Sequence, residues 1–181
     1  MSLPSKEIYT TKDIYALKEG QRAELIDGQI YSMAPPSFLH QRFVSEFTQI
    51  IGQFIKANEG PCIVLPAPFA VFLNNDDKTY VEPDISVICD RNKLDDRGCN
   101  GAPDWIIEIV SPSSIRMDYF TKLFKYRTAG VKEYWIVNPD KQQVLVYDFA
   151  GDGEKTNTYS FTDTIQVGIY ENLHINMSDL I

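Results

Sequence analysis

The sequence predicts a mixed α/β or α+β domain built around a central β-sheet. Two long segments, at residues 38–58 and 115–129, have the apolar spacing of amphipathic helices, and short apolar runs of strand type surround them. Apolar residues make up 44% and charged residues 23% of the 181 residues, a balance typical of a soluble globular domain. Helices that pack on a sheet are the architecture this order of elements favours.

The first half of the chain carries a separate signal for each expected element. Thr11 and Gly20 fit the N-cap and the C-terminal glycine of a short helix. Asp27-Gly28 predicts a hairpin turn. Two prolines in the strand after the long helix favour an edge or bent strand. In order, these elements are a helix over residues 11–19, a hairpin over 23–26 and 29–33, a helix over 38–58, and strands over 62–73 and 79–89.

The second half is expected to contain a helix between strands. Ser111, Ser113 and Ser114 offer capping hydroxyls before the helix, and Gly130 ends it. In order, the elements are a polar loop over residues 90–103, a strand over 105–110, a helix over 115–129, strands over 133–137 and 144–149, and a polar finish of short strands. The length favours one domain over residues 1–181, with a core over 10–150 and C-terminal strands and a tail over 151–181.

Charge and hydropathy limit the function classes. The net charge of −8 argues against non-specific nucleic-acid binding. Of the four segments 1–60, 61–109, 110–139 and 140–181, only 110–139 has a net positive charge, with five basic and two acidic residues. This charge fits either a local phosphate contact or an ordinary exposed helix face. No apolar run approaches the ~20 residues that cross a bilayer. The N-terminus has no secretory pattern, so we expect a cytoplasmic protein without membrane contact.

Cysteine and histidine usage predicts neither a disulfide framework nor a zinc site. The three cysteines, Cys62, Cys89 and Cys99, are odd in number and widely spaced. Only two histidines are present, so a histidine-rich zinc centre is not expected. A metal would instead be a hard cation held by carboxylates.

Glu108 is the most informative single residue. It lies in the middle of the apolar run Trp105-Ile106-Ile107-Glu108-Ile109-Val110, and a carboxylate is costly to bury there without a partner. Glu82 and Asp84 lie on one side of another predicted strand. One Asp and one Glu from neighbouring strands, completed by a backbone carbonyl, can hold a divalent cation. The alternatives are an exposed strand face or a structural ion pair, but Ile106 and Val110 share the face of Glu108, so a fully exposed face is not the simplest explanation.

The helix that follows Glu108 contributes a lysine. Ile115, Tyr119, Lys122 and Tyr126 are expected on one helical stripe, which brings Lys122 beside an aromatic face. There its ammonium can orient a water and stabilise developing negative charge, although a surface pair with Asp118 is the simpler reading.

Other charged residues are candidates for secondary roles. Glu24 is a candidate metal or water ligand, or a solvated strand residue. His40, near the start of the long helix, either reaches the site or caps the helix. Arg116, Lys125 and Arg127 can contact phosphate or be ordinary surface charges.

The ordered set of motifs resembles the Uma family of putative restriction endonucleases, a branch of the PD-(D/E)XK nuclease superfamily. The resemblance covers about residues 10 to 150. It rests on the segments Glu24-Leu25-Ile26-Asp27-Gly28, Met33-Ala34-Pro35-Pro36-Ser37 with His40-Gln41, Pro83-Asp84, Asp95-Asp96-Arg97-Gly98, Gly101-Ala102-Pro103-Asp104, Glu108-Ile109-Val110-Ser111-Pro112-Ser113, Asp118 with Lys122, and Ala129-Gly130-Val131-Lys132-Glu133-Tyr134-Trp135.

The resemblance implies a restriction-endonuclease-like core and a Mg²⁺-dependent DNA endonuclease, with Mn²⁺ as a possible substitute. Asp84, Glu108 and the main chain of Ile109 would hold the metal, and Lys122 would be the catalytic lysine. In the superfamily this lysine stands two residues after the glutamate, where this chain has Val110, so here it would come from the following helix.

The resemblance also implies secondary residues and partners. Glu24 would belong to the catalytic group, and His40 and Arg116 would contact DNA. A homodimer is expected, because cutting two strands takes two sites.

The sequence also fits two other function classes. One is a catalytically silent nuclease-fold module that binds nucleic acid or another partner, which the negative net charge and Val110 favour. The other is a metal-dependent hydrolase of a small phosphate ester. A pocket too narrow for a duplex would favour the small substrate, whereas a broad cleft lined by Arg116, Lys125 or Arg127 would favour DNA.

Overall fold

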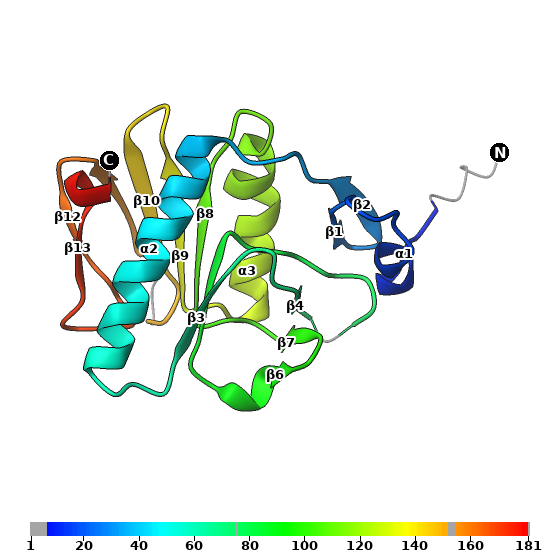
Figure 1. The fold of residues 1–181 in the computed structure, drawn as a ribbon, viewed down its shortest axis with the longest axis horizontal. Helices are drawn as coiled ribbons and strands as arrows, with labels where there is room; N and C mark the ends of the chain where they lie inside the picture. Colours follow the sequence, from blue (N-terminus) through cyan, green and yellow to red (C-terminus); the bar gives the residue numbers. More distant parts are fainter. Residues whose placement is uncertain (1–6, 75, 152–154, 181) are drawn as a thin grey trace.

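A six-stranded mixed β-sheet forms the centre of the molecule in the computed structural model, which describes residues 7–74, 76–151 and 155–180 (Figure 1). The strand order is β11-β10-β9-β8-β5-β3. The β8–β9 pair is parallel and the other neighbours are antiparallel. The strands are β3 (Ile63–Pro66), β5 (Ile85–Ile88), β8 (Trp105–Ile109), β9 (Glu133–Asn138), β10 (Gln143–Asp148) and β11 (Lys155–Ser160). The predicted mixed α and β architecture is confirmed.

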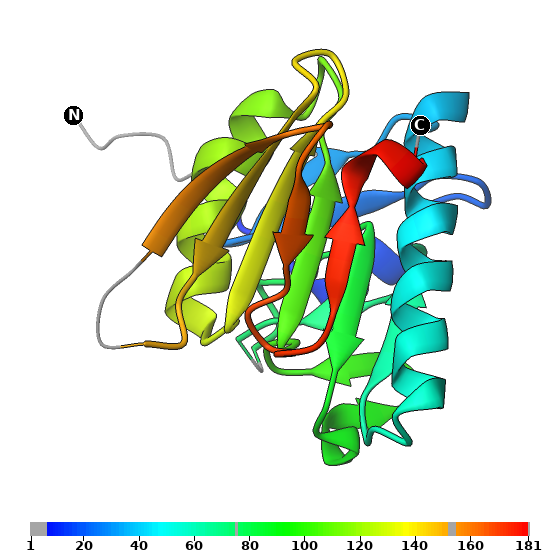
Figure 2. The same ribbon diagram turned by 90° about the vertical axis from the view of Figure 1, so that its left-hand side faces the viewer.

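Both faces of this sheet are covered. Helix α2 (Phe38–Ala57) packs on one face, beside the small hairpin of β12 (Thr164–Gln166) and β13 (His174–Asn176) (Figure 2). The other face carries a π-helical segment (Met117–Lys122) that continues into α3 (Leu123–Ala129). All five residues of β8 are therefore buried, as in strands covered on both sides.

Alternation along β8 decides which face each side chain meets. Trp105, Ile107 and Ile109 belong to the core under α2, whereas Ile106 belongs to the core under α3. Because side chains alternate between the two faces of a strand, Glu108 points to the α3 face. A lysine from that side can reach it directly.

The N-terminal segment packs around a smaller apolar cluster that includes Ile14, Leu25, Phe72 and Tyr80. It consists of α1 (Thr11–Tyr15) and the hairpin of β1 (Ala23–Ile26) and β2 (Gln29–Ser32), which the Asp27-Gly28 turn predicted. Leu25 and Tyr80 exchange backbone hydrogen bonds of 2.7 Å. This bridge holds the hairpin beside the segment that leads to β5.

Several element boundaries differ from the prediction. The strand expected over residues 62–73 is two strands, β3 and β4 (Val71–Phe72), separated at Pro68, since proline cannot donate to a strand ladder. The strand expected over 79–89 is regular only in β5; Tyr80 and Val81 form isolated bridges before it. The helix expected over 11–19 ends at Tyr15.

The expected loop over residues 90–103 has its own structure. It contains a 3₁₀-helix (Arg91–Lys93) and two short strands, β6 (Leu94–Asp95) and β7 (Gly98–Asn100), and β7 pairs with β4. A 3₁₀-helix (Met177–Leu180) follows β13. None of the helices in the described ranges is long and apolar enough to cross a membrane.

Cys62 and Cys89 form a disulfide, contrary to the expectation from their number and spacing. The antiparallel register pairs Ile63 with Ile88, so the two cysteines follow as the next opposed positions. Cysteine spacing along the chain carries no information about this cross-strand placement. Cys99 is a buried free thiol.

Candidate active site

A cavity of about 550 Å³ lies where the β1–β2 hairpin, the start of α2, the end of β8 and the π-helical segment meet. Its charged lining is mainly acidic. The acidic residues are Glu24, Glu82, Asp84, Glu108, Asp118 and Asp140, and the basic or titratable nitrogen groups are those of Arg22, His40 and Lys122. Most of the residues singled out from the sequence therefore lie on one cavity.

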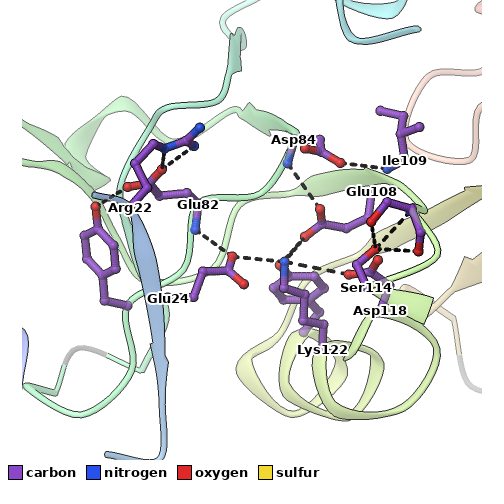
Figure 3. A network of polar contacts seen from close by, with 12 residues as sticks. Arg22, Glu24, Glu82, Asp84, Glu108, Ile109, Ser114, Asp118 and Lys122 are labelled. Carbon is purple, nitrogen blue, oxygen red and sulfur yellow. Dashed lines mark hydrogen bonds and ion pairs between the residues drawn. The ribbon is translucent and has the colours of Figure 1, made fainter. Parts of the chain in front are cut away.

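Asp84 and Glu108 are brought together by the pairing of β5 with β8. The backbone N–H of Asp84 donates to Glu108 Oε2 at 3.3 Å, and the N–H of Ile109 donates to Asp84 Oδ2 at 2.8 Å (Figure 3). The register pairs Ile85 with Ile107, which places Asp84 next to Glu108 at the end of the paired region. The two carboxylates thus share one corner of the cavity.

Lys122 reaches the same corner from the π-helical segment. Its Nζ lies 2.9 Å from Glu108 Oε1, 2.9 Å from Glu24 Oε1 and 3.7 Å from Asp118 Oδ1 (Figure 3). The Lys122 side chain is 6% exposed, so its pair with Asp118 is a buried contact and not a surface pair.

The face of this helix differs from the predicted stripe. Ile115 is 43% exposed, whereas Asp118, Lys122 and Tyr126 are buried. The π-helical turn is wider than an α-turn, so residues four apart stack on one face. Such turns occur frequently at functional sites.

Glu24 is held from two sides. Its Oε1 accepts the hydrogen bond from the backbone N–H of Glu82 at 3.0 Å, besides the Lys122 ammonium. Glu82 itself turns away to Arg22 and to the hydroxyl of Tyr80, which donates to Glu82 Oε1 at 2.6 Å. Glu82 and Asp84 line the same cavity but have different partners.

Tyr126 is a site residue that the sequence analysis placed only on an aromatic stripe. Its hydroxyl donates to Glu108 Oε1 at 2.6 Å, and its side chain is fully buried. The available signal was its spacing of four residues from Lys122, which puts both on one helix face. Asp118 was predicted as a surface partner of Lys122 and as part of the family resemblance, without a role in the site.

The predicted substrate-contact residues have different outcomes. His40 lines the cavity, and its Nε2 lies 3.1 Å from Asp84 Oδ2. His40 Nδ1 is buried and has no hydrogen-bond partner among the described residues. Arg116 is exposed and does not line the cavity, and Lys125 pairs with Asp27 instead. Arg116, Lys125 and Arg127 do not line the cavity that contains these carboxylates, so the cavity is not the broad basic cleft expected for DNA.

Burial and mutual repulsion shape the protonation of the site. Burial raises the pKa of Glu108 well above its usual value, although the Lys122 ammonium opposes this. Burial raises the pKa of Asp118 to about 6. Burial alone would lower the pKa of Lys122, but Glu108, Glu24 and Asp118 outweigh it and hold that pKa well above its usual range. The ammonium therefore stays charged.

The side chains of the cavity supply only part of the ligands that a hard cation needs. Among residues 7–74, 76–151 and 155–180, no three His, Cys, Asp or Glu side chains form a group that could hold a metal by themselves. Asp84 and Glu108 provide two carboxylates, so main-chain or water oxygens would have to complete the shell, as is common for Mg²⁺. Glu24, Glu108 and Asp118 surround a single ammonium, and Asp84 adds a fourth carboxylate beside Glu108, so this part of the cavity is electrostatically suited to a further cation.

The fold is shared with a solved structure. A crystal structure at 1.96 Å described as a putative nuclease belonging to DUF820, from Anabaena variabilis, superposes with a TM-score of 0.76. It is 24% identical, and the match covers 94% of this chain and 96% of that one. Comparison with curated proteins finds no match. The model of the Uma2 family, described as putative restriction endonuclease, matches residues 11–178, and the chain belongs to this family.

Proposed function

We propose that the protein is a divalent-metal-dependent endonuclease that hydrolyses DNA phosphodiester bonds. One observation carries the proposal: the Asp84 and Glu108 carboxylates adjoin each other in an acidic cavity, and the Lys122 ammonium contacts Glu108 at 2.9 Å. Membership of the Uma2 family supports nuclease function. Phosphodiester hydrolysis requires charge neutralisation at the phosphate and a positioned water, which this group of residues can supply.

Asp84, Glu108 and the carbonyl of Ile109 are the proposed ligands. The N–H of Ile109 points toward β5, since it donates to Asp84, whereas the N–H of Val110 points the other way to Val137. N–H and C=O of one strand residue point to the same side, so the Ile109 carbonyl also faces β5. Continuing the register places Pro83 opposite, and proline has no N–H to occupy that carbonyl.

The ion expected there is Mg²⁺, with Mn²⁺ as a substitute, because both accept carboxylate and carbonyl oxygens. When bound, the ion would neutralise charge on the phosphoryl oxygens and lower the pKa of a water. Lys122 would orient the attacking water and stabilise developing negative charge, while Glu24 holds the ammonium in place. His40 lies beside Asp84 at the cavity wall, which suits contact with the substrate near the reacting phosphate.

Supercoiled-plasmid cleavage tests this proposal. The purified protein should nick plasmid with Mg²⁺ or Mn²⁺ and not with EDTA. Asp84→Ala and Glu108→Ala should each abolish nicking and keep a native circular dichroism spectrum. Glu171→Ala, an exposed carboxylate away from the cavity, is the matched control and should cleave normally. Full cleavage by a folded Asp84→Ala or Glu108→Ala protein would refute the proposed roles.

A second candidate is hydrolysis of a small phosphate ester. It is favoured by the cavity lining, from which Arg116, Lys125 and Arg127 are absent. Metal-dependent release of nitrophenol from a nitrophenyl phosphate ester, without plasmid nicking, would select it. A folded protein that binds no Mn²⁺ and cleaves neither substrate would support the catalytically silent nuclease-fold module.

Assembly and location remain proposals as well. We propose a homodimer with C2 symmetry, which would bring two sites to the two strands of a duplex, and light scattering tests it. We also propose a cytoplasmic protein. The Cys62–Cys89 disulfide is unusual for a reducing compartment. Alkylation of thiols under denaturing conditions in freshly lysed cells, read by mass spectrometry, tests the location: protection of Cys62 and Cys89 from alkylation would contradict it.

A further inference from the structure

The ammonium of Lys122 lies among three buried carboxylates. It lies 2.9 Å from an oxygen of Glu24, 2.9 Å from an oxygen of Glu108 and 3.7 Å from an oxygen of Asp118. All four side chains are almost completely buried. A charged group so enclosed is retained only when opposite charges compensate it.

The oxygen atoms that face Lys122 are also used by other donors. Glu24 Oε1 accepts from the backbone N–H of Glu82 at 3.0 Å, and Glu108 Oε1 accepts from the hydroxyl of Tyr126 at 2.6 Å. These bonds direct the oxygens toward the ammonium. Glu108 Oε2 lies on the other side of the same carboxylate, 3.3 Å from the backbone nitrogen of Asp84.

Glu108 therefore divides the corner into two halves. The half toward Asp84 presents carboxylate oxygens and the Ile109 main chain, whereas the half toward Asp118 is filled by the lysine. Two-metal sites place their ions about 3.5–4 Å apart, with carboxylates between them. On the Asp118 side of Glu108 the chain itself supplies a positive charge, which cannot leave because Lys122 is part of the protein.

We propose that this site binds one divalent cation per chain, on the Asp84 side of Glu108, and that Lys122 takes the place of a second cation. This inference rests on the proposed function, since it specifies the metal content of the same site. It assigns Glu24 and Asp118 to holding the lysine and not to ligating metal.

Removal of the positive charge of Lys122 tests this inference directly. Lys122→Met keeps an unbranched side chain but leaves the buried carboxylates of Glu24, Glu108 and Asp118 without their cation. Divalent ions bind oxygens at about 2.0–2.6 Å, so these carboxylates would move inward from their present distances to the ammonium. The variant should therefore bind a second Mn²⁺. Lys125→Met is the matched control, since Lys125 lies three residues later, pairs with Asp27 and does not line the cavity.

Equilibrium dialysis with Mn²⁺ on the full chain counts the sites. The wild-type protein and Lys125→Met should bind one ion per chain, and Lys122→Met should bind two. Two ions on the wild-type protein would overturn this inference and leave the proposed function standing, whereas none would overturn both. If Lys122→Met folds only with Mn²⁺, dialysis at saturating Mn²⁺ still counts its ions, and a count of one or fewer would overturn the replacement of a cation by Lys122.

Discussion

Replacement of Tyr126 by phenylalanine tests how much the hydrogen bond from the Tyr126 hydroxyl contributes to holding Glu108 in place. The substitution removes one oxygen atom from a fully buried ring and keeps its packing against Tyr134, whose ring centroid lies 5.0 Å away. What is lost is the hydroxyl that donates to Glu108 Oε1 at 2.6 Å. Glu108 would then be held on that oxygen by Lys122 alone.

The size of the effect follows from the kind of bond that is lost. A hydrogen bond to a charged group contributes about 1.5–3 kcal/mol. Residues that orient metal ligands change metal affinity by about 10- to 100-fold when mutated. A tenfold change corresponds to about 1.4 kcal/mol, so the two ranges agree. We expect Tyr126→Phe to weaken Mn²⁺ binding by about 10- to 100-fold.

Calorimetric titration with Mn²⁺ measures this directly, and the metal dependence of plasmid nicking should shift by the same factor. Tyr134→Phe is the control, because its hydroxyl donates to the backbone oxygen of Asp118 at 3.1 Å and does not touch Glu108. If both variants lose the same affinity, or if Tyr126→Phe binds Mn²⁺ like the wild type, the reasoning about Glu108 is refuted.

Three further predictions concern stability. Glu133→Gln should lower the unfolding free energy in urea by about 1–3 kcal/mol, since the carboxylate accepts two backbone amides from the β12–β13 connection and an indole N–H; unchanged stability would contradict this. Burial raises the pKa of Asp104, but the Lys132 ammonium and a backbone N–H outweigh it and hold that pKa below its usual value. Its stabilisation is therefore present above about pH 4, the unfolded value, and lost as pH falls through the folded pKa. Asp104→Asn should show a smaller loss of stability than wild type between pH 5 and pH 3, and an equal loss would refute the assignment. Reduction of the Cys62–Cys89 disulfide, which spans 27 residues, should cost about 3–4 kcal/mol by loop entropy, and an unchanged urea midpoint in reductant would show that the bond does not stabilise the fold.

Local signals predicted the elements best where one periodicity held throughout. Helix α2 begins at the predicted residue and ends one residue before the predicted end. The agreement is close because the apolar spacing and the glycine at position 60 indicate the same helix boundary. The hairpin also turns at Asp27-Gly28 as predicted, because this dipeptide favours a two-residue turn by itself. By contrast, the prediction of one strand over residues 62–73 was wrong. The segment divides into β3 and β4 because β3 pairs with β5 and β4 pairs with β7, and these partners are distant in the chain.

The buried charged cluster around Glu108 could be predicted in part, because a charged residue inside an apolar run is visible in a sequence. Glu108 in an apolar run required partners, and Lys122 follows within a helix that directly continues the chain. The aromatic hydroxyl of Tyr126 was not recognisable as a partner, because an aromatic residue on a buried helix face is explained equally well by packing. The place of Asp118 depended on a π-helical turn, for which the sequence contains no clear signal.

The amino-acid sequence alone determined the class of fold, the main helices, the hairpin and the presence of buried charge near Glu108, because propensity, turn chemistry and hydrophobic spacing act over short distances. Only the tertiary structure decided which residues meet. It placed Glu24, from a hairpin 84 positions before Glu108, on the Lys122 ammonium, left Arg116 outside the cavity, and joined Cys62 to Cys89. These contacts depend on strand register and on the packing of elements far apart in the chain, which no local pattern specifies.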